Sequence, residues 1–446
     1  MSDKLDMYDW PEFTSLNARI VESADRIWEY AELAHQEIKS SALLVDWLKD
    51  EGFEVVARGV ADLETSWVAR YGSGAPVIGI LTEFDALPGL GNEAVCSQTP
   101  REDGVTTGHG CGHNLIGSGA TGAAVALKRR MEKEGVPGTL MVFGCPAEEL
   151  LIGKSLMAKA GSFDGLDACL HWHPLNITTA FNFSTVACAD FEFVWHGKTA
   201  HSGASPWEGR SAMHALELFV HGVNAMREHI VPDARMHYHI VQASEAINIV
   251  PDYSKIQVRY RGPDAENVRI NVEWLKQIAN GAAMMTQTVL EDRALAGTFD
   301  CNNNQSINAR ILKHMQHLDA PVWTPEEQMF AKEIQKESSV PQDGLGTCLT
   351  PDPAGAPMGG SSDVGDVSNI TPTGGAIVAC WPLNIPPHHW GCTASNGMSI
   401  GHKGMLYAAR VLALAGWDLL TDKELLGAAK EEFLKTTEGK PYQSLI

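Results

Sequence analysis

Two short motifs in the first third of the chain bring together residue types that bind divalent metal ions. Cys111 and His113 lie two positions apart with glycine on both sides of the cysteine, and Glu148 and Glu149 follow one strand length later. A thiolate and an imidazole suit zinc or a similar divalent ion. In an extended segment both side chains would leave the same face, and the glycines would let the backbone approach an ion. The pattern predicts a metal-dependent hydrolase in which one glutamate binds metal and the other acts as general base.

Continuous apolar segments of strand length lead to these polar residues. They lie at residues 76–81, 139–145 and 165–170. The first precedes Asp85, the second precedes the glutamate pair, and the third precedes His171 and His173. Such runs are typical of buried parallel strands, and ligands of open α/β sheets bind outside the carboxyl ends of the strands. The sequence therefore predicts an α/β domain with a mostly parallel sheet flanked by helices and a site at one sheet edge.

Each motif alone has an ordinary explanation. A lone pair of histidines or glutamates is usually surface or satisfied polar core, and a free cysteine is usually a small buried apolar residue. The glycine and histidine neighbours of Cys111, together with the glutamate pair, favour the metal-site interpretation.

Composition indicates a globular chain and excludes several classes of function. The chain has 446 residues, of which 44% are hydrophobic, and we find no apolar run near 18 residues, so no membrane span is expected. The start lacks the basic and apolar regions of a secretory signal, which favours the cytoplasm. Nine cysteines without framework spacing indicate reduced thiols. A net charge of −21 opposes nucleic-acid binding but does not exclude an anionic substrate.

The pattern of elements changes near residue 186. Up to there, helical and strand patterns alternate; beyond it, a strand alternating polar and apolar residues, a helix, two strands, a helix and a strand are expected, which is a ferredoxin-like order. We therefore predict a catalytic domain of residues 1–185 and 300–446, with an inserted smaller α+β domain of residues 186–299 that acts as a lid or dimerisation domain.

Three motifs together resemble the dimetal amidohydrolases related to aminoacylases and glutamate carboxypeptidases. They are residues 110–114, 146–149 and 197–202. The branch of this family with a cysteine ligand includes hippurate hydrolase and auxin-conjugate hydrolases. The resemblance is closest to the p-aminobenzoyl-glutamate hydrolase branch, through residues 112–115, 362–368 and 401–406, and it covers nearly the whole chain.

The resemblance implies two divalent ions, zinc or manganese, and a set of ligands. The implied ligands are Cys111 as the bridging thiolate, His113, Glu149, His173 and His388. His171 remains an alternative to His173, and His389 and His402 remain alternatives to His388.

The same resemblance assigns roles to three further acidic residues. Glu148 would be the general base, and Asp85 would orient a ligating histidine. Glu83 stands where many distant members carry a ligating histidine, which implies that the cysteine-containing site is completed differently.

The insert contributes its own candidates by resemblance. His201 would reach across a dimer to polarise the scissile carbonyl, and Asn248 would grip the substrate. Apart from the resemblance, Arg210 and Arg259 are candidates for binding a carboxylate. From the residues alone, His201 and Asn248 would more simply form hydrogen bonds within a turn or with a local backbone group.

The implied activity is hydrolysis of the amide bond of an N-acyl or N-aroyl amino acid, with p-aminobenzoyl-glutamate as the nearest example. Two alternatives stay open: a hydrolytic deaminase of an aromatic amine on the same scaffold, and a noncatalytic metal-binding relative. A purely structural zinc site is less favoured, because such sites are closed by four ligands and leave no adjacent glutamate unused. The expected partners are a small-molecule amide substrate, a second copy of the chain through the insert, and a second hydrolase subunit.

Overall fold

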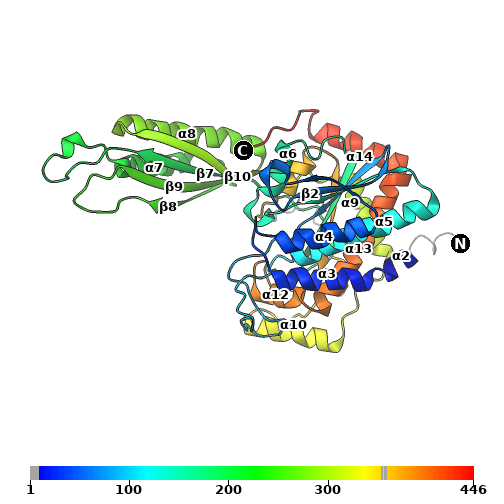
Figure 1. Cartoon of the computed structure of the whole chain (residues 1–446). Helices are drawn as coiled ribbons and strands as arrows, with labels where there is room; N and C mark the ends of the chain where they lie inside the picture. The colour runs from blue at the N-terminus through cyan, green and yellow to red at the C-terminus, as the bar shows by residue number, and fades with distance from the viewer. Residues whose placement is uncertain (1–9, 353–354, 356–358) are drawn as a thin grey trace. The chain divides into compact units, whose positions relative to one another are not determined.

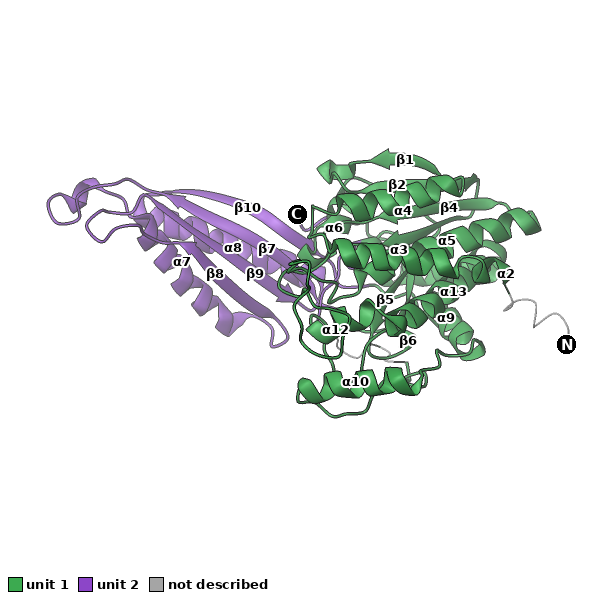
Figure 2. Cartoon of the chain, turned by 60° about the horizontal axis from the view of Figure 1, so that its bottom comes forward, with its two compact units in different colours: residues 1–184, 302–357, 367–442 green, residues 185–301, 358–366, 443–446 purple. Residues whose placement is uncertain are grey.

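A computed structural model describes residues 10–352, 355 and 359–446 (Figure 1). The chain divides into two compact units (Figure 2). The larger unit comprises Met1–Ser184, Asn302–Pro357 and Val367–Tyr442, and the smaller comprises Thr185–Cys301, Met358–Asp366 and Gln443–Ile446, each as far as its residues are described. The predicted insert thus corresponds to the main segment of the smaller unit, while the two short segments that join it were not predicted.

The larger unit is built on a mixed sheet in the order β1-β2-β4-β3-β5-β11-β6. Its strands are β1 (Glu54–Arg58), β2 (Trp67–Ser73), β3 (Val77–Thr82), β4 (Gly138–Gly144), β5 (Ala168–Leu175), β6 (Thr179–Ala180) and β11 (Thr373–Ala379). The four central strands β4, β3, β5 and β11 pair in parallel, and their residues are almost all buried, as expected for strands covered on both faces. The carboxyl ends of these four strands therefore meet at one edge, which confirms the mostly parallel sheet.

Helices cover this sheet, and the start of one of them, α5 (His113–Glu134), lies at the edge where the parallel strands end. Across the described chain the α-helices are α2 (Pro11–Thr14), α3 (Asn17–Tyr30), α4 (Ile38–Asp50), α5 (His113–Glu134), α6 (Gly153–Lys159), α7 (Ala212–Met226), α8 (Ala265–Thr286), α9 (Gln305–His317), α10 (Pro325–Glu337), α11 (Val364–Ser368), α12 (Trp390–Asn396), α13 (Ser399–Thr421) and α14 (Lys423–Thr436). Short 3-10 helices lie at Val60–Asp62, Glu148–Leu150, Pro206–Glu208 and Arg227–His229. The helix α5 packs between α3 and α13, and glycines and alanines along it permit this close approach. Its buried start is thereby fixed at the sheet edge.

The smaller unit is a four-stranded antiparallel sheet covered by α7 and α8. Its strands, in spatial order, are β10 (Val289–Thr298), β7 (Ala187–His196), β9 (Tyr253–Gly262) and β8 (Arg235–Gln242). Along β9, buried and partly exposed residues alternate strictly, which is the pattern of a sheet with one face on a core. The chain order strand, helix, strand, strand, helix, strand confirms the predicted α+β insert.

No helix in the described ranges 10–352, 355 and 359–446 combines the length and apolar character needed to span a membrane.

Candidate metal centre

A left-handed glycine sets the relation between Cys111 and His113. Gly112 has φ of 77° and caps α5, so Cys111 precedes the helix and His113 is its first residue. The extended segment expected from the sequence is therefore wrong, and a tight turn takes its place. A Cβ atom on Gly112 would also lie 2.6 Å from Cγ of Pro174, so both the backbone conformation and the space require glycine.

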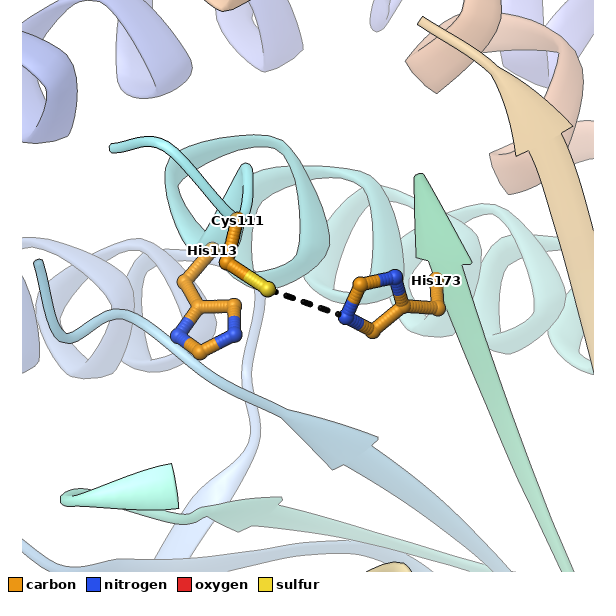
Figure 3. A group of neighbouring side chains, drawn as sticks. All are labelled: Cys111, His113 and His173. Carbon is orange, nitrogen blue, oxygen red and sulfur yellow. Dashed lines mark hydrogen bonds between the residues drawn. The ribbon is translucent and has the colours of Figure 1, made fainter. Parts of the chain in front are cut away.

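The turn directs the Cys111 thiol between two imidazoles. Figure 3 shows Cys111 and His113 at the start of α5 and His173 on β5, with the sulfur lying between the two rings. The distance from Sγ of Cys111 to Nε2 of His173 is 3.4 Å, and Nδ1 of His173 bonds the Pro174 carbonyl at 2.7 Å. That second bond requires the proton on Nδ1, which leaves the Nε2 lone pair facing the thiol.

Asp85 holds two parts of the site with its two oxygens. Its Oδ1 lies 2.9 Å from Nδ1 of His113, and its Oδ2 accepts the backbone N–H of Glu149 at 3.0 Å. The carboxylate thereby fixes the ring so that Nε2 of His113 faces the centre, an arrangement that would suit a residue orienting a ligating histidine.

A strained turn connects β4 to Glu148 and Glu149, and the buried carboxylate of Glu37 accepts a hydrogen bond from this turn. Ala147 has φ of 57°, and its N–H donates to Oε1 of Glu37 at 2.9 Å. Thr65 lies 2.9 Å from the other oxygen of Glu37. Burial, with the nearby Asp85 carboxylate adding to it, raises the pKa of Glu37 to about 7. Sequence reasoning missed Glu37, because a contact across more than a hundred residues leaves no local signal.

The predicted ligands lie within the span of one metal centre. Three groups of ligand atoms lie close together among the described residues: Cys111, His113 and His173; Cys111, Glu149 and His388; and Glu83, His113 and Glu148. His388 Nε2 is 3.3 Å from Oε2 of Glu149, while His113 Nε2 is 3.8 Å from Oε2 of Glu148 and 3.9 Å from Oε1 of Glu149. The first two groups share Cys111, as a bridging thiolate requires.

Unsatisfied atoms in this cluster fit a bound cation. Nε2 of His113, Oε1 of Glu149 and Oε2 of Glu83 are buried and make no hydrogen bond. Buried polar atoms normally have partners, and these three belong to the residue types that coordinate zinc and manganese. The donor set therefore fits a divalent ion.

The electrostatic potential created by the carboxylates at this site also favours a bound cation. Burial and the neighbouring Glu149 carboxylate raise the pKa of the Cys111 thiol well above its ordinary range. Burial opposes charge on His113, yet the Asp85 carboxylate raises the pKa of that imidazole well above its ordinary value. Carboxylates thus dominate the electrostatics at this edge, and a cation among them would stabilise both the carboxylates and a thiolate.

The alternative histidines have other contacts. Burial lowers the pKa of His171 to about 3, and its ring packs on Phe181 with centroids 4.8 Å apart. His389 caps α12 by accepting the N–H of Gly391, and His402 lies 2.6 Å from an oxygen of Asp25. None of the three belongs to a ligand group among the described residues.

The candidates of the insert lie in the smaller unit. His201 is exposed, and its Nδ1 accepts the N–H groups of Gly203 and Ala204 at 3.2 and 3.1 Å. The neutral ring therefore carries its proton on Nε2, which can donate to a substrate. Asn248 is exposed on the adjacent segment, where its carbonyl accepts the N–H of Ser202 at 3.1 Å.

Both candidate arginines are engaged within the smaller unit. Arg210 donates to Oε1 of Gln287 at 2.6 Å and to the carbonyl of Gly209 at 2.6 Å. Arg259 makes two hydrogen bonds to Asp190, at 2.7 and 2.6 Å, so its guanidinium already binds a carboxylate. A substrate role for Arg259 would require that pair to break.

Comparisons with known proteins agree with this architecture. Residues 186–284 match the M20 peptidase dimerisation domain. The chain is 34% identical to one of the subunits of p-aminobenzoyl-glutamate hydrolase from Escherichia coli, over 96% of this chain and 94% of the relative. It is 26% identical to a human Xaa-Arg dipeptidase over 94% of this chain and 90% of the relative. A dinuclear metal-binding M20 peptidase from Bacillus subtilis has a similar fold, with a TM-score of 0.56, 18% identity, and coverage of 90% of this chain and 98% of that one.

Proposed function

The chain belongs to the M20 family of metallohydrolases, which act on amide bonds, and from this premise we propose that its substrate is an N-acyl or N-aroyl amino acid. The observation that carries the proposal is the position of Glu148, a buried carboxylate beside the group formed by Cys111, Glu149 and His388. p-Aminobenzoyl-glutamate is the first substrate to consider, because a relative matching nearly the whole chain is a subunit of an enzyme that bears its name.

We assign the roles at the metal centre as follows. Two divalent ions, zinc or manganese, would be held by Cys111, His113, Glu149, His173 and His388, and Cys111 belongs to both ligand groups that these residues form. When bound, such ions lower the pKa of water and offset charge on a carbonyl oxygen. Glu148 removes the proton from the attacking water and passes it to the departing amine. Asp85 keeps His113 in the tautomer that can bind metal.

Two residues of the smaller unit complete the proposed mechanism. His201 presents an N–H at Nε2, and we assign it to the scissile carbonyl of a substrate bound by a partner copy. Asn248 offers an exposed amide for a polar group of the substrate, and Arg210 is retained as a carboxylate contact. The match of residues 186–284 to a dimerisation domain supports a homodimer as the active form.

The test is amide hydrolysis by the purified full chain. The panel contains p-aminobenzoyl-glutamate, other N-acyl and N-aroyl amino acids, and a dipeptide ending in arginine, each with added manganese or zinc and with a chelator. We expect chelator-sensitive release of the free amino acid, fastest for the aroyl substrates. Faster cleavage of the arginine dipeptide would instead place the activity with the Xaa-Arg dipeptidases.

Product analysis separates the remaining alternatives. Release of ammonia from an aromatic amine, without cleavage of the amide, would replace the proposal by a deaminase. Absence of turnover with metal bound would call for a second hydrolase subunit, since the relative from Escherichia coli is itself one subunit of a hydrolase. Absence of turnover with that subunit also present would indicate a noncatalytic protein.

A further inference from the structure

Glu83 is a buried carboxylate whose two oxygens have different surroundings. Its side chain is 5% exposed, and Oε1 lies 2.7 Å from Nζ of Lys154, whose side chain is fully buried. Its Oε2 is buried and accepts no hydrogen bond. Leaving a carboxylate oxygen without a partner in the interior is costly, so this atom calls for a cation or donor.

This oxygen lies close to another buried polar atom that makes no hydrogen bond. Oε2 of Glu83 lies 3.5 Å from Nε2 of His113, which is also buried and makes no hydrogen bond. Asp85 engages the other ring nitrogen, so the neutral ring presents the Nε2 lone pair to the Glu83 oxygen. Two lone pairs at this separation repel each other unless a proton or a metal ion lies between them, and a bound metal ion would take the place of that proton.

The separation suits two ligands of one ion. Oxygen and nitrogen ligands each about 2.0–2.1 Å from a tetrahedral ion lie about 3.4 Å apart, and a sulfur–nitrogen pair lies about 3.6 Å apart. The Glu83–His113 distance of 3.5 Å matches the first value, and the Cys111–His173 distance of 3.4 Å is near the second. By this measure Glu83 is as well placed as the ligands predicted from the sequence.

On the basis of the proposed function, we propose that Glu83 is a further ligand of the metal centre, giving Oε2 to the ion that His113 holds while Lys154 retains Oε1. In this arrangement Lys154 influences how Glu83 binds the ion. It restricts Glu83 to binding through one oxygen and offsets part of the negative charge that a further carboxylate brings.

The test measures metal binding rather than turnover. The full chain is loaded with cobalt(II) under reducing conditions, and ion content, affinity and the visible absorption spectrum are recorded for the wild type and Glu83→Gln. We expect the variant to bind one of the two ions at least tenfold more weakly. Its cobalt d–d bands should change, while the thiolate-to-cobalt band from Cys111 persists.

Two further variants keep this test interpretable. Glu83→Gln with Lys154→Met removes both charges, so that no buried lysine is left without its carboxylate, and it should show the same loss of affinity. Glu327→Gln is the matched control, because Glu327 is also buried and paired with a lysine, Lys403 at 2.7 Å, yet belongs to no ligand group among the described residues. It should bind both ions normally.

The outcomes separate this inference from the proposed function. Wild-type protein that binds no ion would overturn the proposed function itself. Two ions in the wild type, with unchanged affinity and spectrum in both Glu83 variants, would overturn only the role of Glu83. A crystal structure of the cobalt-loaded wild type decides the matter without a variant, since Oε2 of Glu83 either contacts an ion or does not.

Discussion

Glu148 and Glu149 are neighbours in sequence but face different groups. Oε2 of Glu149 lies 3.3 Å from Nε2 of His388, and the backbone N–H of Glu149 donates to Oδ2 of Asp85. Oε2 of Glu148 lies 3.8 Å from Nε2 of His113. A ligand must be fixed, while a base must reach a water molecule and return a proton. We therefore keep the proposal that Glu149 is the ligand and Glu148 the base, and two variants test it.

Glu148→Gln should separate binding from chemistry. We expect it to retain both ions, because the predicted ligands stay in place, and to lower kcat by about 10²–10⁴, the usual contribution of a general base. Metal analysis and steady-state kinetics on the same preparation check this. Glu149→Gln is the comparison and should lose metal; turnover near the wild-type rate in Glu148→Gln would contradict the base assignment.

Asp85→Asn tests whether the tautomer of His113 matters. The asparagine oxygen would keep the N–H of Glu149, so its NH₂ group would face Nδ1 of His113 and drive the ring proton to Nε2. A protonated Nε2 cannot bind metal, and we expect metal affinity to fall about 10–100-fold. Titration with zinc against a competing chelator measures this. Unchanged affinity would mean that packing alone orients the ring.

At the scale of elements, local patterns predicted the central strands well and the connections between them poorly. The apolar segments at residues 76–81 and 139–145 became β3 and β4 with one-residue shifts, because a buried strand must be apolar throughout. The third segment extends further than predicted, so His171 and His173 lie within β5 and not beyond it. The helix α14 was not predicted, although Asp422 caps its start.

The same contrast holds for the candidate site. Cys111, His113, Glu149, His173 and His388 could be proposed together because each follows or ends a recognisable motif. The left-handed turn at Gly112 and the Lys154–Glu83 pair could not, because they depend on contacts between distant segments. Sequence thus identifies the chemical groups, and tertiary packing decides their orientation and charge.

The turn before Glu148 should make stability depend on pH through Glu37. The pKa of this buried carboxyl is raised to about 7 from its ordinary 4.5, so its stabilising contribution is complete below pH 4.5 and is lost as the pH rises through 7. This rise corresponds to roughly 3 kcal/mol. Glu37→Gln imitates the neutral acid, accepting the N–H of Ala147 and donating to Thr65. Relative to this variant, the wild type should lose roughly 2–3 kcal/mol of unfolding free energy between pH 5 and pH 8.

Urea unfolding of the metal-free protein at the two pH values checks this prediction. Glu327 supplies a control of opposite sign, because burial raises its pKa but the Lys403 and Ser399 contacts outweigh burial and lower it. Stability from Glu327 is therefore lost as the pH falls. An equal pH dependence in wild type and Glu37→Gln would show that Glu37 is ionised at pH 5.

At the scale of the whole molecule, the two edges of the smaller unit's sheet differ in their suitability for association. The edge strand β10 presents Glu291, Asp292 and Arg293, and charges of this kind protect an edge from pairing. The opposite edge strand, β8, exposes Tyr238, Ile240 and Val241 at 36%, 43% and 46%. Both edges carry unpaired backbone groups, but a second copy of the chain finds more exposed apolar side chains along β8 than along β10.

Ile240→Asp should consequently weaken the proposed homodimer while the unit stays folded. A charge on an exposed edge leaves the core of the unit intact, but it must be desolvated when two β8 strands meet, so we expect the dimer dissociation constant to rise at least tenfold. Light scattering over a dilution series measures the mass. Val289→Asp at the other edge is the matched control, since Val289 is 68% exposed on β10 and should leave the mass unchanged. If Val289→Asp dissociates the dimer and Ile240→Asp does not, β10 is the interface; if the wild type is monomeric alone, His201 must act within its own chain or be supplied by a second subunit.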